Sequence, residues 1–233
     1  MDKKIVLAAL LAFSTAAHAD MLRVRALGGY TTFAMKELNA SLDKQATAFE
    51  SAGLTKKKDD RLGAGYMAGL EVASGLLIPL PFMEVALRGE LVGGSSEYNY
   101  EGSAGQKATG KTDALLTNGL VGLVVGLDLP LTGLGLGLGA YGGYGYAVLK
   151  SSSASLIGAS ASASSAQYTG GGFVSELEAK LKYSIIPMVA VDLFGGMRFA
   201  SISSMTDGSS TGALKDPVDF SGFNVGGGLT IGF

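Results

Sequence analysis

The sequence predicts an all-β protein, an eight-stranded antiparallel transmembrane up-and-down β-barrel, from three observations. Apolar and polar residues alternate with a period of two in eight segments, the pattern of strands with two unlike faces. The connections between these segments alternate between long and short, as they do in membrane-spanning barrels. Of the 233 residues, 36 are glycine, 47% are hydrophobic and 16% are charged, which is too apolar for disorder and too rich in glycine for a helical bundle.

The first residues have the pattern of an export signal. Lys3 and Lys4 precede an apolar stretch from Ile5 to Phe13, and Ala17-His18-Ala19 forms a small-x-small cleavage site. The sequence therefore predicts a signal peptide at 1–19 and a barrel domain at 20–233. The absence of cysteine is consistent with an exported envelope protein that needs no disulfide.

The alternation is clearest in two segments. From Met83 to Leu91 the odd positions are apolar or glycine, whereas three of the four even positions are charged. From Phe173 to Tyr183 apolar residues alternate with Glu176, Glu178, Lys180 and Lys182. A helix would spread both sets around its circumference, so each segment is predicted to be a strand.

Eight strands are predicted, and their spacing indicates how they are connected. Their ranges are 22–32, 62–73, 82–94, 113–128, 134–149, 172–184, 188–201 and 218–233. The connections run 29, 8, 18, 5, 22, 3 and 16 residues, which predicts short periplasmic turns and long extracellular loops. The stretch from Ser151 to Gly170, rich in serine, alanine and glycine, is expected to be a flexible outer loop.

Charged residues fall on the face assigned to the barrel interior. An eight-stranded barrel encloses a space that side chains can fill, and unpaired buried charge is costly, so these residues are predicted to form an ion-paired lumen. The alternative is that they are the solvated face of a soluble sheet. The predicted set comprises Arg23, Arg25, Glu71, Glu84, Arg88, Glu90, Asp128, Glu176, Glu178, Lys180, Lys182, Asp192 and Arg198.

The C-terminal strand ends in an aromatic residue, Phe233, preceded at alternate positions by Ile231, Leu229 and, farther back, Val225. This ending resembles the C-terminal signal of bacterial outer-membrane barrels. Together with the eight strands, it resembles the small-barrel superfamily of the OmpA transmembrane domain, OmpX and OmpW. The resemblance implies a location in the outer membrane of a Gram-negative cell, recognition by the barrel-assembly machinery, and contact with membrane lipid and lipopolysaccharide.

Aromatic belts are expected at the two membrane interfaces. The chain has no tryptophan, so tyrosine and phenylalanine would have to form them. The expected members are Tyr30, Tyr144, Tyr146, Phe82, Tyr183 and Phe233.

The first long connection is predicted to contain one short amphipathic helix. Its apolar residues recur at steps of three and four, and Gly53 is placed to end it. Two interpretations are open, a lid or lipid-facing element at the barrel mouth, and a helix that buries its stripe against neighbouring loops. The stripe comprises Met35, Leu38, Leu42, Ala46 and Phe49.

The residue types argue against catalysis. The one histidine, His18, lies in the predicted signal peptide, and without cysteine the mature chain lacks the usual base, thiol nucleophile and commonest metal ligands. A Ser–Lys or paired-carboxylate site is open in principle, but ion pairing explains Glu176, Glu178, Lys180 and Lys182 equally well. We therefore expect no enzyme activity, no cofactor and no metal. The formal net charge of −2 gives no indication of a nucleic-acid partner.

Two functions follow as hypotheses. The first is a structural or surface-interaction protein with a side-chain-filled lumen, whose extracellular loops meet an unidentified ligand. The second, which the likeness to OmpW implies, is a porin-like passage for small hydrophobic molecules gated by the helix of the first loop.

Overall fold

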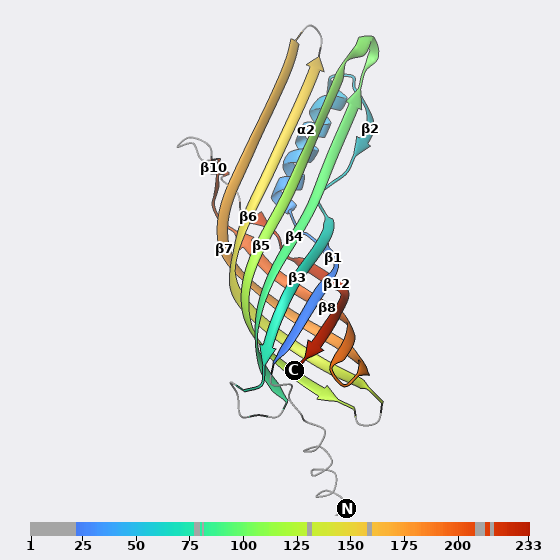
Figure 1. The fold of residues 1–233 in the computed structure, drawn as a ribbon. Helices are drawn as coiled ribbons and strands as arrows, with labels where there is room; N and C mark the ends of the chain where they lie inside the picture. The colour runs from blue at the N-terminus through green and yellow to red at the C-terminus, as the bar shows by residue number, and fades with distance from the viewer. Residues whose placement is uncertain are drawn as a thin grey trace, which may run out of the picture.

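The computed structural model describes residues 22–76, 80, 82–129, 132–157, 160–207, 213, 214 and 217–233 (Figure 1). The predicted signal peptide and its cleavage site lie outside the described residues. The elements are β1 (Arg23–Thr32), α2 (Lys36–Ser51), β2 (Thr55–Asp59), β3 (Ala64–Ser74), β4 (Met83–Glu101), the 3-10 turn η1 (Ser103–Gly105), β5 (Lys107–Asp128), β6 (Leu134–Ile157), β7 (Ser160–Ile186), β8 (Val189–Ile202), β9 (Met205–Thr206), β10 (Ala213–Leu214), β11 (Val218–Asp219) and β12 (Gly222–Gly232).

Eight of the described strands form a closed antiparallel ring in the order β1, β3, β4, β5, β6, β7, β8 and β12. The ring closes where β1 pairs with β12, from Arg23 opposite Gly232 to Thr31 opposite Asn224. Leu22 and Phe233 continue this ladder with two backbone hydrogen bonds, of 3.3 and 2.8 Å. The predicted eight-stranded barrel is therefore confirmed. None of the described helices is long and apolar enough to cross a membrane.

Alternation places the apolar face outward. In β4, Leu87 is 59% exposed, whereas its neighbours Ala86 and Arg88 are buried. The outward aromatic side chains include all six that were expected to form the belts, and each is at least 46% exposed. Tyr30 pairs with Tyr66 across β1 and β3, and Tyr144 pairs with Phe173 across β6 and β7, which places aromatic residues toward the long-loop end of the barrel. Phe82, Tyr183 and Phe233 lie toward the short-turn end, as expected for two interfacial belts.

β4, β5, β6 and β7 continue well beyond the other strands of the barrel (Figure 1), and the prediction of a flexible outer loop between Ser151 and Gly170 was wrong. The Ser151–Gly170 stretch is not a flexible loop, because β6 and β7 remain paired from Lys150 opposite Gln167 to Ile157 opposite Ser160. Serine hydroxyls meet across this ladder at 2.8 Å, in the pairs Ser153–Ser164 and Ser155–Ser162. β5 pairs with the other side of β6 as far as Leu156, so strand pairing outweighs a composition typical of loops.

The predicted helix of the first long connection is confirmed as α2. It lies alongside the extended parts of β4, β5 and β6 (Figure 1). Gly53, with φ of +81°, takes the left-handed conformation expected just after a helix end.

The predicted apolar stripe of α2 faces the protein, which agrees with the second interpretation of this helix. Met35 and Leu42 are buried, and Leu38 packs against the main core. Ala46 and Phe49 pack against a second cluster, in which the Phe49 and Tyr100 rings lie 5.4 Å apart. The helix therefore braces the protruding sheet and is not a free lid.

The register makes a direct prediction about β4. Replacing Leu87 with arginine should lower the free energy of unfolding by about 2–4 kcal/mol if the site lies near the bilayer midplane, because the charge would face lipid. Ala86→Ser, one position away on the inward face, should cost less. Denaturant titration in lipid vesicles measures both, and a larger loss for Ala86→Ser would mean that every inward residue had been assigned to the wrong face.

Candidate functional site: the filled lumen

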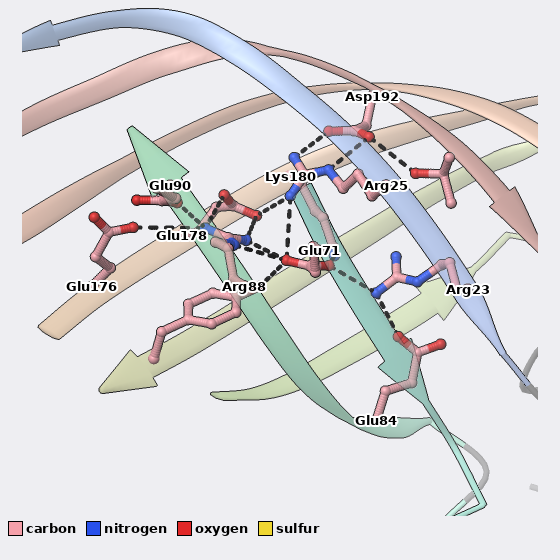
Figure 2. Close-up of polar contacts among 12 residues, drawn as sticks. Arg23, Arg25, Glu71, Glu84, Arg88, Glu90, Glu176, Glu178, Lys180 and Asp192 are labelled. Carbon is pink, nitrogen blue, oxygen red and sulfur yellow. Dashed lines mark hydrogen bonds and ion pairs between the residues drawn. The ribbon is translucent and has the colours of Figure 1, made fainter. Parts of the chain in front are cut away.

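Charged side chains from five strands fill the interior of the barrel toward its short-turn end (Figure 2). Each comes from an inward position of β1, β3, β4, β7 or β8, because the period of two sends alternate residues to the same face. We call this set the charge network: Arg23, Arg25, Glu71, Glu84, Arg88, Glu90, Glu176, Glu178, Lys180 and Asp192. All but Glu84 are less than 9% exposed.

Arg25 joins β1 to β7 and β8. Its Nε donates to Asp192 Oδ2 at 3.0 Å, its Nη2 pairs with Asp192 Oδ1, and its Nη1 donates to Glu178 Oε1 at 2.8 Å. Thr230 donates to the same Asp192 carboxylate at 3.4 Å, and the Phe194 ring lies 5.0 Å from the guanidinium carbon. Arg25 is fully buried, so its planar guanidinium holds three strands at fixed separations.

Arg88 is the most connected cation of the charge network. Its Nη2 and Nε donate to Glu71 Oε2 at 2.5 and 2.9 Å. Its Nη1 lies 3.3 Å from Glu90, 3.1 Å from Glu178 and 3.6 Å from Glu176. One guanidinium therefore links carboxylates from β3, β4 and β7.

Tyr141 completes the environment of Arg88 and was not predicted from the sequence. Its hydroxyl donates to Glu71 Oε2 at 2.8 Å, and its ring lies 3.8 Å from the Arg88 guanidinium carbon. Gly122 and Gly139 make room for this ring, since a Cβ at either position would lie within 2.6 Å of it. A sequence signal existed, because Tyr141 is the next inward position after Gly135, Gly137 and Gly139.

The short-turn end of the network is held by weaker or more exposed contacts. Arg23 Nη2 reaches Glu84 at 2.5 Å and Glu71 at 3.3 Å. Lys180 Nζ lies 3.9 Å from Glu71 Oε1. The structure places two of the predicted lumen residues, Lys182 and Asp128, at the rim, where they pair at 2.9 Å and the Asp128 side chain is 53% exposed.

Arg198 lies apart from the charge network and binds neutral groups. Its three nitrogens donate to the Phe220 carbonyl at 3.0 Å, to Thr31 Oγ1 at 2.9 Å and to Asn224 Oδ1 at 3.3 Å. Its nearest carboxylate oxygen belongs to Glu176, 3.9 Å away. The inward parity of Thr31 and Asn224 was available in the sequence, but neutral side chains carry no charge pattern to single them out.

Toward the extracellular end, an apolar cluster replaces the charges. Strand residues of the inward face meet residues that follow β1, precede β3 or precede β12, and all are at most 6% exposed. We call this set the apolar plug: Phe33, Met35, Leu62, Leu116, Leu149, Ile202, Met205 and Phe220. The Phe33 and Phe220 rings make an edge contact with centroids 6.0 Å apart. The interior is thus filled by two layers of opposite character.

A third polar cluster joins the extracellular elements to one another. Asp59 of β2 pairs with Arg61 through both carboxylate oxygens and accepts a hydrogen bond of 3.0 Å from Tyr100 of β4. Arg61 also pairs with Asp43 of α2 at 2.7 Å. Burial alone would raise the pKa of Asp59, but hydrogen bonds from Arg61 and Tyr100 outweigh it and hold this pKa below its usual value. Burial, together with Asp59, raises the pKa of Tyr100 to about 12.

These interactions favour pairing over catalysis or metal binding. Among the described residues there is no group of three or more His, Cys, Asp or Glu side chains arranged to hold a metal ion. The carboxylates of the charge network instead face guanidinium groups, which a metal ion would have to displace. Buried pairs of this kind constrain geometry strongly, since removing one partner leaves an uncompensated charge.

Arg88→Ala should therefore lower the free energy of unfolding by about 3–5 kcal/mol, because it leaves carboxylates of three strands without their shared cation. Lys182→Ala, which breaks an ion pair at the solvated rim, should cost about 0–1 kcal/mol. Denaturant titration in lipid vesicles compares the two. Equal losses would show that the lumen is solvated like the rim.

The Asp59 cluster makes a prediction about pH. Because the pKa of Asp59 is lowered in the folded protein, its stabilising contribution is present above the unfolded pKa and is lost as pH falls through the folded pKa. Hydrogen-exchange protection of α2 should therefore weaken in acid in the wild type. Asp59→Asn should lower protection at neutral pH and flatten this acid response. The control Asp60→Asn changes an exposed carboxylate whose ion pair is with Lys58, and a flattened response there would contradict the assignment to Asp59.

Comparison with known proteins finds similar solved structures but no related sequence. No protein-family model matches the sequence, and no curated protein matches it significantly. Solved structures do resemble it. Neisserial surface protein A has a TM-score of 0.44 at 12% identity, with 92% of this chain and 99% of that chain covered. OprG from Pseudomonas aeruginosa has a TM-score of 0.44 at 11% identity, covering 93% and 99%.

The N-terminal barrel domain of OprF from Pseudomonas aeruginosa has a TM-score of 0.37 at 11% identity, covering 93% of this chain and 100% of that domain. At these scores the comparisons carry no argument about function, and the fold rests on the ring itself. The ring has eight antiparallel strands, no open edge between β1 and β12, an apolar outer wall and a filled interior. The chain has the fold of the small eight-stranded outer-membrane β-barrels.

Proposed function

We propose that this chain is a non-enzymatic outer-membrane protein whose barrel is closed to passage and whose protruding sheet meets partners outside the cell. The single observation that carries the proposal is the two-layer filling of the lumen. A solute crossing the barrel would have to displace both the charge network and the apolar plug. The apolar outer wall and the outward aromatic residues at both ends of the barrel support the outer-membrane location, as does the predicted signal peptide.

The part of the molecule built for contact is the protruding sheet. β6 has 24 residues and β7 has 27, whereas a tilted strand crosses a bilayer in about 9–11. This sheet is braced from one side by α2 and by the Asp59 cluster. A rigid, raised platform lowers the ordering cost of binding compared with flexible loops.

The two edges of the protruding sheet differ. β2, which contains Lys56, Lys57 and Lys58, covers the edge of β4, and lysine is a residue that discourages further strand pairing. On the other edge, the uncharged segment 160–168 of β7 pairs with β6 alone among the described strands. An edge without charge, proline or bulge can accept an extended segment of another protein by strand addition.

The second candidate function, passage of small apolar molecules, has one observation in its favour. An apolar recess of about 580 Å³ lies across β5, β6, β7 and β8. Seven of its ten lining residues face outward, among them Leu138, Leu181 and Leu193, so it is a groove in the lipid-facing wall. We rank this function second because the proposed gate, α2, buries its apolar stripe.

Single-channel recording in planar bilayers tests the closed lumen. The wild type should show no steady current, because ion pairs and apolar side chains fill the cross-section. Arg88→Ala and Lys182→Ala should each stay closed, because the apolar plug still blocks the cross-section, whereas Arg88→Ala combined with Leu116→Ala, which opens both layers, should leak. Steady conduction by the wild type, unchanged in Arg88→Ala, would overturn the proposal and favour the passage.

We further propose that the C-terminal strand is the segment that the barrel-assembly machinery recognises. The four residues of the predicted signal all face outward, where another protein can reach them before insertion: Val225, Leu229, Ile231 and Phe233 are between 40% and 62% exposed. Membrane lipid and lipopolysaccharide are proposed to cover the same face afterwards.

Deleting Phe233 should reduce the fraction of folded barrel in outer membranes much more than deleting Ser162 from the protruding hairpin. The reason is that Phe233 belongs to the proposed recognition signal and also closes the ladder with Leu22. Heat-modifiable gel migration of membrane fractions reports the folded fraction. If both deletions gave the same fraction, the terminal signal would have no special role.

A further inference from the structure

Where the charge network borders the apolar plug lie three inward polar side chains whose polar atoms are incompletely paired, two of them members of the network. They are Glu90 of β4, Asn118 of β5 and Glu176 of β7, and each is at most 3% exposed. Glu90 and Asn118 are directly opposite each other in the β4–β5 ladder. Four of their polar atoms have no hydrogen-bond partner if both carboxyl groups are ionised. These atoms are Glu90 Oε2, Glu176 Oε1 and both amide atoms of Asn118. Buried polar groups are rarely left unpaired, so these atoms need an explanation.

The two carboxyl groups lie close together, since Arg88 Nη1 is 3.3 Å from Glu90 Oε1 and 3.6 Å from Glu176 Oε2. Figure 2 shows them side by side, on the same side of Arg88. Two ionised carboxylates in such a position repel and have no donor between them. One proton supplies that donor, because a protonated carboxyl donates through its O–H while the other carboxylate accepts.

The surrounding cations do not separately neutralise both groups. Arg88 is 3.3 Å from Glu90 and 3.6 Å from Glu176, but it also pairs with Glu71 and Glu178. Arg198 lies 3.9 Å from Glu176, and all three of its nitrogens already donate to neutral groups at shorter distances. The remaining titratable neighbour is Tyr141, which donates to Glu71 and not to this pair.

The charge count of the interior leads to the same result. The charge network together with Arg198 contains six carboxyl groups, Glu71, Glu84, Glu90, Glu176, Glu178 and Asp192. It contains five cations, Arg23, Arg25, Arg88, Lys180 and Arg198. One bound proton makes the interior neutral.

We propose that Glu90 and Glu176 form a proton-binding site in which the two carboxyl groups share a single proton taken from water. The site lies directly under the apolar plug, so the shared proton lowers the charge of the pair from −2 to −1 next to apolar side chains. Asn118 borders the site with an uncharged amide. The site extends the proposed closed lumen but does not depend on the extracellular function.

Glutamine substitution tests the site because glutamine mimics a neutral carboxyl. Glu90→Gln and Glu176→Gln should each fold with a denaturation midpoint close to that of the wild type, since either change leaves five carboxylates facing five cations. The double variant should lose much more than the sum of the two single effects, because it leaves one cation without a carboxylate. Glu178→Gln is the matched control, and it should lower the midpoint as a single change because Glu178 pairs with both Arg25 and Arg88. Single losses at Glu90 and Glu176 as large as that of Glu178→Gln would overturn the proposal.

Infrared spectroscopy gives a readout that needs no destabilised variant. At neutral pH the wild type in lipid vesicles should show the carbonyl stretch of one protonated carboxyl group, shielded from rapid deuterium exchange. Either single glutamine variant should lose this band, because the remaining carboxylate no longer shares a proton, whereas Asp128→Asn at the exposed rim, outside the charge network, should keep it. Absence of the band in the wild type would overturn the shared proton, and a closed lumen in bilayer recordings would still stand.

Discussion

The pairing of β1 with β12 is the interaction on which the rest of the structure depends. A sheet in lipid has no water to satisfy its edges, so the ladder from Arg23 opposite Gly232 to Thr31 opposite Asn224 is what allows the chain to span. Closing the sheet at eight strands also fixes the interior width, which side chains can fill. The charge network and the apolar plug are two ways of filling this space, and each guanidinium that spans it ties distant strands together. The number of strands therefore determines that the sheet closes, that side chains can fill its interior and that the barrel is rigid.

The rigid barrel in turn supports the protruding sheet. The pairing registers among β4, β5, β6 and β7 continue without a shift from the barrel into the protruding sheet. The protruding sheet is therefore a direct extension of the barrel wall. α2 and the Asp59 cluster then brace this sheet by apolar packing and ion pairs. In the proposed function, the membrane-spanning part is closed and the protruding sheet contacts the partners.

Much of this architecture could be predicted from the sequence, because it rests on a local rule. A period of two assigns a face to each residue, so Leu87 outward and Arg88 inward followed from the alternation alone. The stripe from Met35 to Phe49 likewise predicted an amphipathic helix, although the sequence left open what its apolar side would contact. The fate of 151–170 could not be predicted, because its serine and alanine residues favour no conformation and its order comes from pairing with β5 through β6. The sequence also could not show which residues contact one another across the lumen. The positions of Tyr141 over Arg88 and of Lys182 at the rim depend on the tilt and stagger of strands far apart in the chain.

If side chains fill the lumen from end to end, a thiol inside it is hidden from water-soluble reagents. The chain has no cysteine, so single cysteines can be introduced without background. Leu116→Cys places a thiol in the apolar plug, and Asp128→Cys places one at the exposed rim. In folded barrels, a water-soluble maleimide should label the rim thiol readily and leave the plug thiol unlabelled until the protein is denatured. Labelling of Leu116→Cys in the folded barrel at a rate comparable to that of Asp128→Cys would show that the lumen is open to water.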